Sequence, residues 1–231
     1  MSPGREGIVD SKTFDEKYRG RLLKLSTTNL SDALDKVGLR GAVSGIRPMY
    51  ACPRIVGRAV TIKIMAAGML KSEHHLGVHA IDAADSGDII VIDNHGDTEN
   101  NCWGEILSMG AKMKGVSGVV IDGAARDIDM CEEFEFPVYA RGTVPITARG
   151  RIMQESFNQV VRIGNVQVRP GDIVMADING VVIVPVEKLD EVLEVAEEIS
   201  QKEEAMVAEL KKGVPIIEVD KKYAYEQMLK K

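Results

Sequence analysis

The sequence predicts an α/β protein that forms one domain. Up to Thr143, short β-branched runs bounded by glycine or aspartate alternate with segments of helical periodicity, as expected for strands and helices that cover each other. Hairpin signals replace this alternation after Thr143, and one long amphipathic segment follows them. Because no internal repeat or low-complexity linker interrupts the chain, we expect one domain over residues 1–231, with residues 1–20 as an N-terminal extension and residues 213–231 as a C-terminal arm.

The composition is that of an ordinary soluble protein. Hydrophobic residues make up 45% and charged residues 28%, and the net charge of -6 is spread over interleaved acidic and basic residues. No basic stripe suggests nucleic-acid binding, and no apolar run is long enough to span a membrane. The three cysteines, Cys52, Cys102 and Cys131, have neither a zinc-site spacing nor a disulfide pattern, so we expect a cytoplasmic protein.

The first predicted elements are a helix, a loop and a strand. Residues 1–20 are polar, and we expect the beginning of the chain to be loosely ordered. Residues 26–28 (Ser-Thr-Thr) offer N-cap side chains for a helix that ends at Gly38. Residues 38–54 are rich in Gly, Pro and Arg and predict a loop, and residues 56–65 alternate as a strand.

The middle of the chain predicts a second strand and a helix with a polar loop between them. Residues 89–93 form a short buried strand, and residues 95–101 predict a loop at its carboxyl end, where open α/β sheets place their ligands. A helix follows from about Cys102 to Lys114. The expected inner face of this helix consists of Trp103, Ile106, Leu107 and Ala111.

The stretch from Gly118 to Asp127 predicts a strand, a tight turn and the start of the next helix. Residues 119–121 are β-branched and suit a strand covered on both faces, and Gly123 relaxes the steric limits on a turn. Arg126 and Asp127 come where a helix offers free backbone N–H groups and the positive end of its dipole. Such a pair can hold a carboxylate substrate and a divalent metal, although for an Arg-Asp dipeptide taken alone a surface ion pair beside a turn is the favoured explanation.

Hairpins and a long helix complete the chain. A strand at residues 138–140 precedes two hairpins, which turn at Gly164-Asn165 and at Asn179-Gly180, a pair that type I′ turns prefer. The sheet is expected to stop at Pro185. The inner face of the long helix consists of Leu189, Val192, Leu193, Ala196 and Ile199.

Isolated side chains offer weaker candidates for a site. Lys63, in a predicted strand, and Lys71 are possible Schiff-base nucleophiles, but a lysine on the polar face of a strand is more common. His75 and His79 are four residues apart in a segment that predicts a helix, a spacing that suits a metal but lacks the accompanying Glu of known zinc motifs. Glu105 falls in the first turn of its helix, where the dipole alone favours an acidic residue.

Several motifs in this order and spacing resemble one family. Residues 31–35, 45–48 and 56–61 resemble its opening signature, residues 103–107 and 118–127 its central one, and residues 169–172 and 176–182 its closing one. Together, from about Leu25 to Lys212, they are similar to the RraA-like family. That family includes the 4-hydroxy-4-methyl-2-oxoglutarate aldolases, which also decarboxylate oxaloacetate.

The resemblance implies a swivelling β/β/α domain, assembly into homotrimers or homohexamers, and active sites at subunit boundaries. Enzymatic members resemble class II pyruvate aldolases, and their site motif is an acid, twenty intervening residues and then Arg-Asp. Glu105 occupies the first position here, residues 106–125 are the twenty, and Arg126-Asp127 follow. Glu replaces the aspartate of the best-known aldolases. The family also contains a ribonuclease inhibitor, and such regulators tend to lack the acid after the arginine.

The resemblance also implies a role for each site residue. Asp127 would hold Mg²⁺ or Mn²⁺ directly, with Glu105 as a direct or water-mediated ligand or as the base, and Arg126 would pair with the keto or enolate oxygen. The backbone N–H groups of Ile106 and Leu107, just after Gly104, would bind the pyruvoyl carboxylate. The implied reaction is retro-aldol cleavage of a 4-hydroxy-2-oxo acid to pyruvate, with oxaloacetate decarboxylation through the same enolate.

Two alternatives stay open at this stage. One is a non-catalytic protein that binds a partner enzyme, as the regulators of the family do, and the other is a Schiff-base aldolase. The residues that recognise the distal half of a 2-oxo acid are expected on loops or on a neighbouring subunit. The candidates for this recognition are His74, His75, His95 and Glu203.

Overall fold

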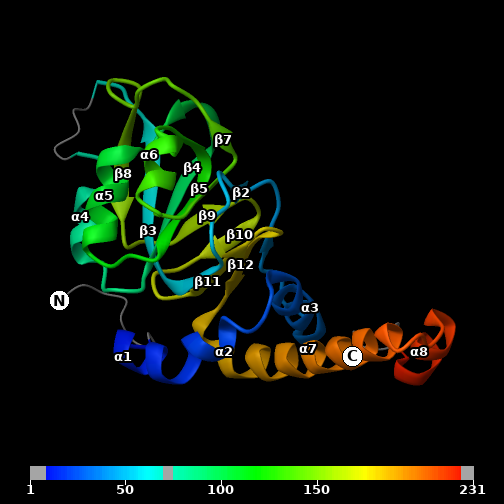
Figure 1. The fold of residues 1–231 in the computed structure, drawn as a ribbon. Coiled ribbons are helices and arrows are strands. Elements are labelled where there is room, and N and C mark those ends of the chain that lie inside the picture. The colour runs from blue at the N-terminus through cyan, green and yellow to red at the C-terminus, as the bar shows by residue number, and fades with distance from the viewer. Residues whose placement is uncertain (1–8, 70–74, 225–231) are drawn as a thin grey trace.

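The computed structural model describes residues 9–69 and 75–224, and one twisted sheet runs through the middle of it (Figure 1). Four neighbouring strands are parallel, namely β3 (Ile55–Ala66), β4 (Ile89–Asn101), β5 (Gly118–Ala125) and β6 (Val138–Ala140). The hydrogen-bonded order is β1-β12-β11-β3-β4-β5-β6-β2, so that antiparallel strands continue the sheet on both sides. Every residue of β5 is buried, as expected for a strand covered on both faces.

Short strands and helices surround the parallel strands. The other strands are β1 (Ala42–Val43), β2 (Arg47–Pro48), β7 (Gly142–Thr143), β8 (Ile152–Phe157), β9 (Val161–Ile163), β10 (Val166–Val168), β11 (Ile173–Asp177) and β12 (Gly180–Val184). The helices are α1 (Ser11–Phe14), the π-helical η1 (Asp15–Arg19), α2 (Gly20–Leu22), α3 (Thr27–Val37), α4 (Val78–Ala83), α5 (Glu105–Met113), α6 (Ile128–Glu133), the 3₁₀ helix η2 (Val186–Lys188), α7 (Leu189–Lys211) and α8 (Ile216–Tyr223).

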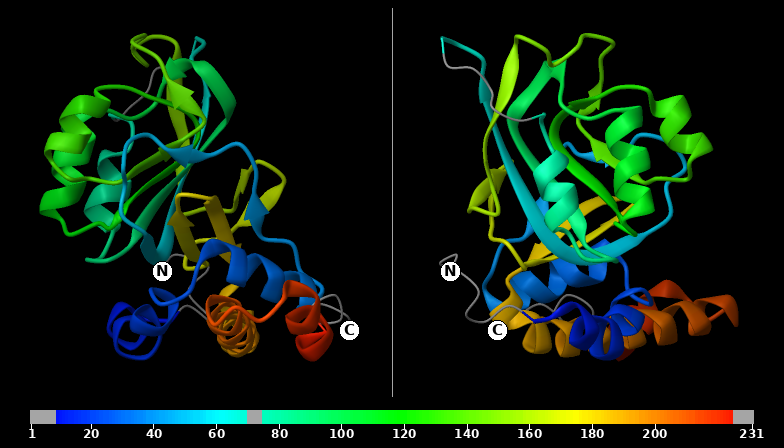
Figure 2. Two further views of the ribbon diagram at one scale, coloured as in Figure 1. Left: turned by 45° about the vertical axis from the view of Figure 1, so that its right-hand side comes forward. Right: turned by 90° about the vertical axis from the view of Figure 1, so that its left-hand side faces the viewer.

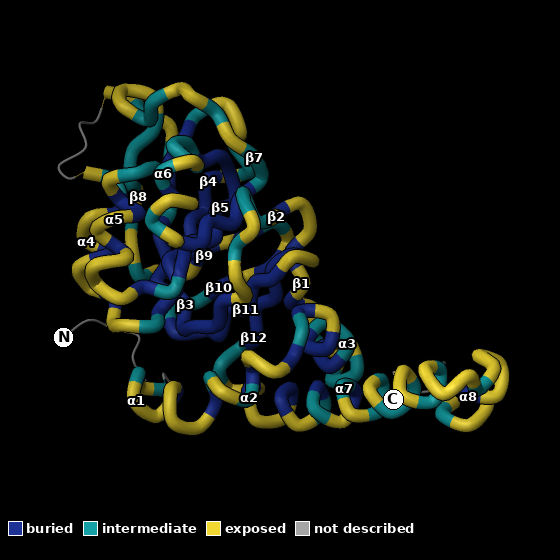
Figure 3. Tube along the Cα trace, in the orientation of Figure 1, coloured by how far each residue is buried: buried dark blue, intermediate teal, exposed yellow. Residues whose placement is uncertain are grey.

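Three apolar cores separate the layers of the protein (Figure 2). One lies between the parallel strands and helices α4 to α6, and it includes Trp103 and Ile121. A second, with Val91 and Val174, lies between the other face of those strands and β9 to β12. The third packs α1 to α3 and α7 against β11 and β12 around Leu30. Figure 3 shows the strands as the buried centre, and this β/β/α arrangement confirms the predicted fold class.

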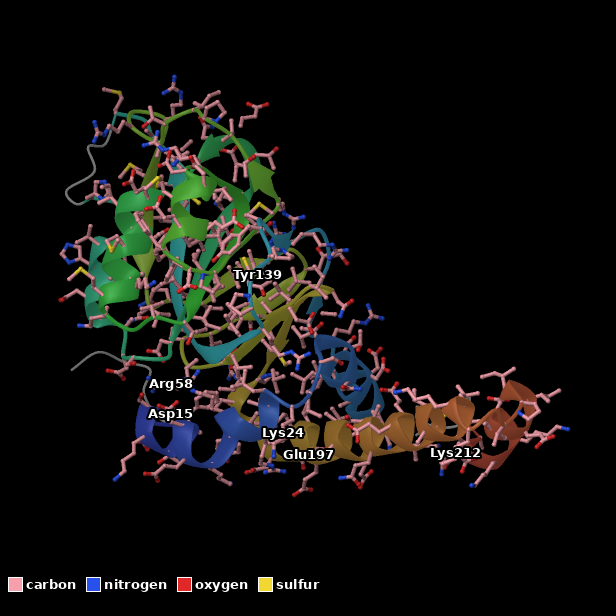
Figure 4. All side chains as sticks on the ribbon, in the orientation of Figure 1. Asp15, Lys24, Arg58, Tyr139, Glu197 and Lys212 are labelled. Carbon is pink, nitrogen blue, oxygen red and sulfur yellow. The ribbon has the colours of Figure 1, made fainter. Side chains whose placement is uncertain are left out.

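The two helices with the clearest sequence signals form as predicted. Ser26 caps α3 by accepting a hydrogen bond from the Asn29 N–H, and Gly38 ends the helix with a φ of 81°. The buried side chains of α7 are Leu189, Val192, Leu193, Ala196 and Ile199. The far half of α7 extends beyond the sheet, so that Lys212 lies well away from it (Figure 4), and α8 packs on this half. None of the described helices is long and apolar enough to cross a membrane.

Some local features differ from the sequence expectations. The sequence pattern does not predict the helices at residues 11–22, which form because the apolar side chains of Phe14, Tyr18 and Leu22 are buried in the third core. Of the beginning that is expected to be loosely ordered, residues 1–8 lie outside the described residues. The predicted loop at residues 38–54 contains the short strands β1 and β2, which pair with β12 and β6.

The predicted Asn-Gly turn of the β11–β12 hairpin is wrong. Asp177 pairs with Gly180, so the central residues of the turn are Ile178 and Asn179, and Asn179 does not have a positive φ. The Asp177 carboxylate accepts a hydrogen bond from the Asn179 N–H at 2.9 Å. This local contact fixes a turn other than type I′.

Polar residues of the family motifs serve the fold. Arg58 is 8% exposed, and its guanidinium lies 2.8 Å from Asp88 and 2.9 Å from Asp85, between the sheet and the N-terminal helices (Figure 4). Arg169 pairs with Asp172 at 2.9 Å. A buried ion is tolerated only when it is paired, so these motif residues have a structural reason to be present.

Asp177 makes a testable contribution to stability. Its buried carboxylate accepts hydrogen bonds from the Thr27 N–H at 2.9 Å and the Thr27 hydroxyl at 2.7 Å, and so fastens α3 to β11. Burial raises the pKa of Asp177, but these bonds and that from Asn179 outweigh it and leave the pKa below the ordinary 3.8. We expect Asp177→Asn to lower the free energy of unfolding by about 1–3 kcal/mol at neutral pH.

The pH dependence of this difference has a definite sign. Because the folded pKa lies below the unfolded one, the stabilisation is present above the unfolded value and is lost as the pH falls through the folded value. Urea unfolding of Asp177→Asn and wild type should therefore converge in acid. Asp82→Asn, at a side chain that is 87% exposed, is the matched control. A difference that stays constant down to the acid transition would contradict the assignment.

Candidate active site

The predicted site lies at the carboxyl ends of β4 and β5, where α5 and α6 begin. Strand β5 continues to Ala125, so Arg126 and Asp127 follow it directly. The Arg126 N–H donates to the Trp103 carbonyl at 3.0 Å, and the Cys102 N–H donates to the Ala124 carbonyl at 3.1 Å. These two bonds hold the segment before α5 alongside the segment before α6.

The structure brings Glu105, Arg126 and Asp127 together. Asp127 Oδ2 accepts a hydrogen bond from the Glu105 N–H at 3.3 Å, and Arg126 Nε lies 3.3 Å from the same oxygen. The side chain of Arg126 is 38% exposed and that of Asp127 is 37% exposed. The sequence predicts separate roles for Arg126 and Asp127 in place of a mutual ion pair, and in this state the pair is present. Arg126 Nε is buried and makes no well-aligned hydrogen bond to a described residue, so the contact is electrostatic.

Gly104 permits this close approach. A Cβ at residue 104 would lie 2.6 Å from Asp127 Oδ2 and 3.3 Å from Arg126 Cγ. Any larger residue would therefore push the carboxylate away from the start of α5. The contribution of Gly104 to the site is the absence of a side chain.

Gly123 also acts through close approach, and the prediction that it forms a turn is wrong. It lies inside β5 without a positive φ. A Cβ there would lie 2.8 Å from both Asn94 Nδ2 and the Asp97 carbonyl oxygen. This contact exists because residues 95–101, predicted as a loop, continue β4 with irregular register alongside β5. The glycine makes room for a neighbouring strand that the sequence does not reveal.

Asp127 has an unusual backbone conformation. It is the N-cap residue of α6, with a φ of 54° and a ψ of 40°, in the left-handed region. An N-cap aspartate usually accepts a hydrogen bond from its own helix, but this side chain makes no such bond and turns to the start of α5. Left-handed backbone costs a non-glycine residue on the order of 1–2 kcal/mol, and aspartate tolerates it better than most. Strain of this kind is concentrated at functional sites.

The first turn of α5 offers anion-binding groups. Within the described residues, the Ile106 and Leu107 N–H groups have no hydrogen-bond acceptor, whereas the Ser108 N–H donates to the Gly104 carbonyl at 3.0 Å. Free N–H groups and the positive end of a helix dipole attract carboxylates. The prediction that the Ile106 side chain lies on the inner face is wrong, because it is 77% exposed. The helix begins at Glu105 and not at Cys102, and this later start turns Ile106 outward.

The carboxylates available to a metal are those of Glu105 and Asp127. The Glu105 carboxylate is half-buried and has no hydrogen-bond or ion-pair partner in the described part of the chain. No cluster of three or more His, Cys, Asp or Glu side chains suited to a metal occurs among the described residues. Mg²⁺ and Mn²⁺ accept one or two carboxylates together with water and substrate oxygens, so this donor set fits them. It does not fit a structural zinc site, which needs four protein ligands.

Among the weaker lysine and histidine candidates, those that the structure describes have contacts of their own. Lys63 pairs with Glu155 at 2.9 Å, and this contact raises the lysine pKa, the opposite of what a Schiff-base nucleophile requires. Helix α4 begins at Val78, so His75 and His79 do not share a helical face, and that prediction is wrong. The His79 ring stacks on a phenylalanine of β8. Lys71 and His74 lie outside the described residues.

The other candidates for distal recognition also have contacts of their own. His95 has a φ of 54°, and its Nε2 lies 2.8 Å from the Ile64 carbonyl oxygen. Glu203 lies on α7 and accepts a hydrogen bond from Asn29 Nδ2 at 2.8 Å. Helix α5 packs on the parallel strands in the first core, whereas α7 lies in the third core at the lower end of the molecule (Figure 1), so Glu203 is not part of the group around Asp127 within one chain.

One residue beside the site escaped the sequence analysis. Ser108 is fully buried, and its hydroxyl contacts Trp103, Gly104 and Cys131. Burial raises the pKa of the Cys131 thiol, although the contact with Ser108 opposes this. Helical spacing places Ser108 one turn after the N-cap residue Gly104, but it gives no sign of the contact with Cys131 on α6.

Comparison with known proteins relates this chain to one protein family. The family model described as RraA-like: Aldolase/RraA matches residues 27–183. A Halalkalibacterium halodurans protein, described as a candidate 4-hydroxy-4-methyl-2-oxoglutarate aldolase, is 34% identical over 181 residues, which are 78% of this chain and 82% of that protein. Protein DlpA of Legionella pneumophila is 29% identical over 96% of this chain, and the chain spans 36% of its length.

Solved structures of similar proteins share this fold. RraAS2 of Streptomyces coelicolor, described as an unusual member of the RNase ES inhibitor RraA protein family, has a TM-score of 0.75 at 27% identity. The match covers 85% of this chain and 96% of that one. The family model covers more than half of the residues, and the fold agrees with it. This chain therefore belongs to the RraA-like family.

Proposed function

We propose that this protein is a divalent-metal-dependent lyase that cleaves a 4-hydroxy-2-oxo acid to pyruvate and also decarboxylates oxaloacetate. The observation that carries this proposal is the meeting of Arg126, Asp127 and the first turn of α5 at the carboxyl end of β5. There the Arg126 guanidinium, the Asp127 carboxylate, the backbone of Glu105 and free N–H groups lie within one small region. The names of relatives such as the H. halodurans protein support an aldolase.

Each group has a role suited to its chemistry. The N–H groups of Ile106 and Leu107 bind the carboxylate next to the keto group, as helix starts bind anions. Asp127 would hold Mg²⁺ or Mn²⁺ directly and Glu105 only through water, which leaves the Glu105 carboxylate free to act as the base. The cation would supply Lewis-acid stabilisation of the developing negative charge. Arg126 donates hydrogen bonds to the C2 oxygen, on which that charge develops. Its Nε lacks a well-aligned acceptor among the described residues, and the side chain as a whole is 38% exposed.

The proposed bond cleavage balances with these residues. Glu105, whose carboxylate has no partner among the described residues, accepts the proton of the C4 hydroxyl. The C3–C4 bond breaks, C4 becomes a carbonyl, and the bonding electrons move to the C2 oxygen as an enolate beside Arg126. A proton then returns to C3 and pyruvate leaves. In oxaloacetate the bond to the departing CO₂ breaks instead and gives the same enolate.

We further propose that the protein acts in the cytoplasm as a homotrimer or homohexamer with sites between subunits. Exposed apolar side chains on α5, directly beside the site, support a partner there. Ile106 is 77% exposed and Met113 is 83% exposed. Exposed apolar side chains in such a row are typical of interaction surfaces. The extended α7 and α8 are a second surface suited to a neighbouring subunit.

Metal removal provides the first test of the proposal. We expect a lactate-dehydrogenase-coupled screen of 2-oxo acids to detect pyruvate with Mg²⁺ or Mn²⁺ and to lose that signal in EDTA, because Asp127 and Glu105 cannot replace the cation's charge. Borohydride should trap no covalent adduct, since Lys63 is ion-paired. Trapping together with indifference to EDTA would instead establish Schiff-base chemistry.

The main competing function is a regulator, and the RraAS2 structure is the observation that favours it. A regulator would give no pyruvate from any 2-oxo acid under either metal, and it would bind a protein partner in stoichiometric amount. The acid after Arg126 argues for the lyase, because the resemblance implies that regulators tend to lack it. The same preparation can therefore distinguish the two functions.

A further inference from the structure

A buried hydrogen-bond junction connects the starts of α5 and α6. Trp103 Nε1 donates to Ser108 Oγ at 2.9 Å, and Ser108 Oγ donates to the Gly104 carbonyl at 3.0 Å. Cys131 Sγ, on α6, lies 3.2 Å from the same hydroxyl oxygen. Trp103, Ser108 and Cys131 are all fully buried. One hydroxyl thus joins the segment before α5, α5 itself and α6 at a point that water does not reach.

The chemistry of the partners restricts the direction of each bond. An indole N–H can only donate, so Trp103 donates to the Ser108 oxygen. The single hydroxyl proton of Ser108 goes to the Gly104 carbonyl or to Cys131 Sγ. When it goes to Gly104, the Cys131 thiol donates to the second lone pair of the hydroxyl oxygen and every member of the junction is satisfied. A satisfied buried network favours one geometry.

The junction lies directly behind the groups that the proposed function uses. Gly104 precedes Glu105 and the free N–H groups of α5. Cys131 lies one turn into α6, and its N–H donates to the Asp127 carbonyl at 3.1 Å. The direct contact across the site, from Asp127 Oδ2 to the Glu105 N–H, is long at 3.3 Å. The backbone bonds from Arg126 to Trp103 and from Cys102 to Ala124 join the segments before the two helices, and the contacts through Ser108 add a side-chain link from α5 to α6 itself.

We propose that Ser108 is a positioning residue, which holds the start of α5 at a fixed place relative to Asp127 through its bonds to Gly104, Trp103 and Cys131. The inference rests on the proposed function, since it assigns Ser108 to the spacing between the metal ligands and the carboxylate-binding N–H groups. Ser108 itself touches neither substrate nor metal. Partners behind metal ligands typically change metal affinity or activity by 10–100-fold when they are removed.

The test compares Ser108→Ala with Ser117→Ala. Ser117 donates a comparable hydrogen bond to the Gly87 carbonyl at 3.0 Å, at the opposite end of β5, and so controls for the loss of one serine bond. Thermal unfolding establishes that each variant folds. Calorimetric titration with Mn²⁺ alone gives Kd, and the coupled assay gives kcat and KM. Trp103, the single tryptophan, reports on the junction by its emission.

We expect Ser108→Ala to weaken Mn²⁺ binding and lower kcat by about 10–100-fold, with a shifted Trp103 emission. Ser117→Ala should lose stability without either change. A folded Ser108→Ala with wild-type Kd and kcat overturns the inference, and so does equal impairment of Ser117→Ala. Wild-type protein that neither binds Mn²⁺ nor forms pyruvate overturns the proposed function and this inference with it.

A second pair of variants keeps the test decisive if Ser108→Ala does not fold. Cys131→Ala removes only the bond to α6 and leaves those of Trp103 and Gly104. We expect it to weaken Mn²⁺ binding several-fold with Trp103 emission close to wild type. Cys131→Ser restores a donor, and it should recover the affinity. Identical Mn²⁺ affinity in Cys131→Ala, Cys131→Ser and wild type overturns the inference.

Discussion

Arg126→Ala is expected to lower kcat/KM for pyruvate formation by about 10²–10³-fold, the usual cost of losing one donor to a developing oxyanion. Arg126 is the cation beside Asp127, and its Nε makes no well-aligned hydrogen bond to a described residue. The loss should fall mainly on kcat, because the C2 oxygen gains its charge only as the C3–C4 bond breaks. The coupled assay at saturating Mn²⁺ measures both constants.

Two further variants test this explanation of the Arg126 effect. Arg126→Lys keeps the charge but lacks the planar fork, so it should recover only part of the rate. Arg149→Ala, at an exposed arginine of the loop after β7, should retain wild-type activity. Full activity in Arg126→Ala would show that Arg126 takes no part in the reaction, whether or not the activity requires a metal.

Asp127→Asn is expected to weaken Mn²⁺ binding by about 10²-fold or more and to abolish most turnover, because a hard divalent cation loses a charged oxygen ligand. The backbone should be little affected, since asparagine tolerates the left-handed conformation that residue 127 adopts. Mn²⁺ titration followed by calorimetry measures the binding directly. A folded variant with wild-type Mn²⁺ affinity would place the metal elsewhere.

A neighbouring aspartate provides the matched control for this substitution. Asp129 lies in the first turn of α6 and is exposed, so Asp129→Asn makes the same chemical change close to the same helix start. It should leave both Mn²⁺ affinity and kcat near wild type. A comparable loss in Asp129→Asn would mean that the general charge of the region, and not ligation by Asp127, draws the cation.

Asp127 cannot make all of its contacts at once. In this structure its carboxylate accepts the Glu105 N–H and lies beside Arg126. Binding a cation would draw that oxygen away from both groups. The Glu105 N–H and the Arg126 guanidinium would then be free for the carboxylate and keto oxygens of a substrate. The proposed chemistry thus explains why the ion pair and the separate roles of these residues are compatible.

Much of the fold follows from local sequence. Residues 119–121 form part of a buried strand, and Ser26 and Gly38 delimit α3 as their capping chemistry predicts. The errors occur where tertiary contacts override local preference. Residues 95–101 look like a polar loop, but they lie against β5 because Gly123 leaves space for Asn94. No local pattern carries information about that neighbour.

In the candidate site too, some features follow from the sequence and others depend on tertiary contacts. The spacing of Glu105, Arg126 and Asp127 could be found from the sequence, and the structure places all three in one region. The steric role of Gly104 and the junction at Ser108 could not be found, because each depends on two segments that meet only in the folded chain. Side chains that act through contact with another element leave no periodic signal.

The most direct measurement is the yield of pyruvate from 4-hydroxy-4-methyl-2-oxoglutarate, with Mn²⁺ and after its removal by chelation. Cleavage of the C3–C4 bond in this compound converts both halves to pyruvate. The proposed function therefore predicts two molecules of pyruvate for each substrate consumed with Mn²⁺, none above background after chelation, and recovery when Mn²⁺ is restored. Equal yields with and without metal, or no pyruvate in either condition, would contradict a metal-dependent lyase built on Glu105, Arg126 and Asp127.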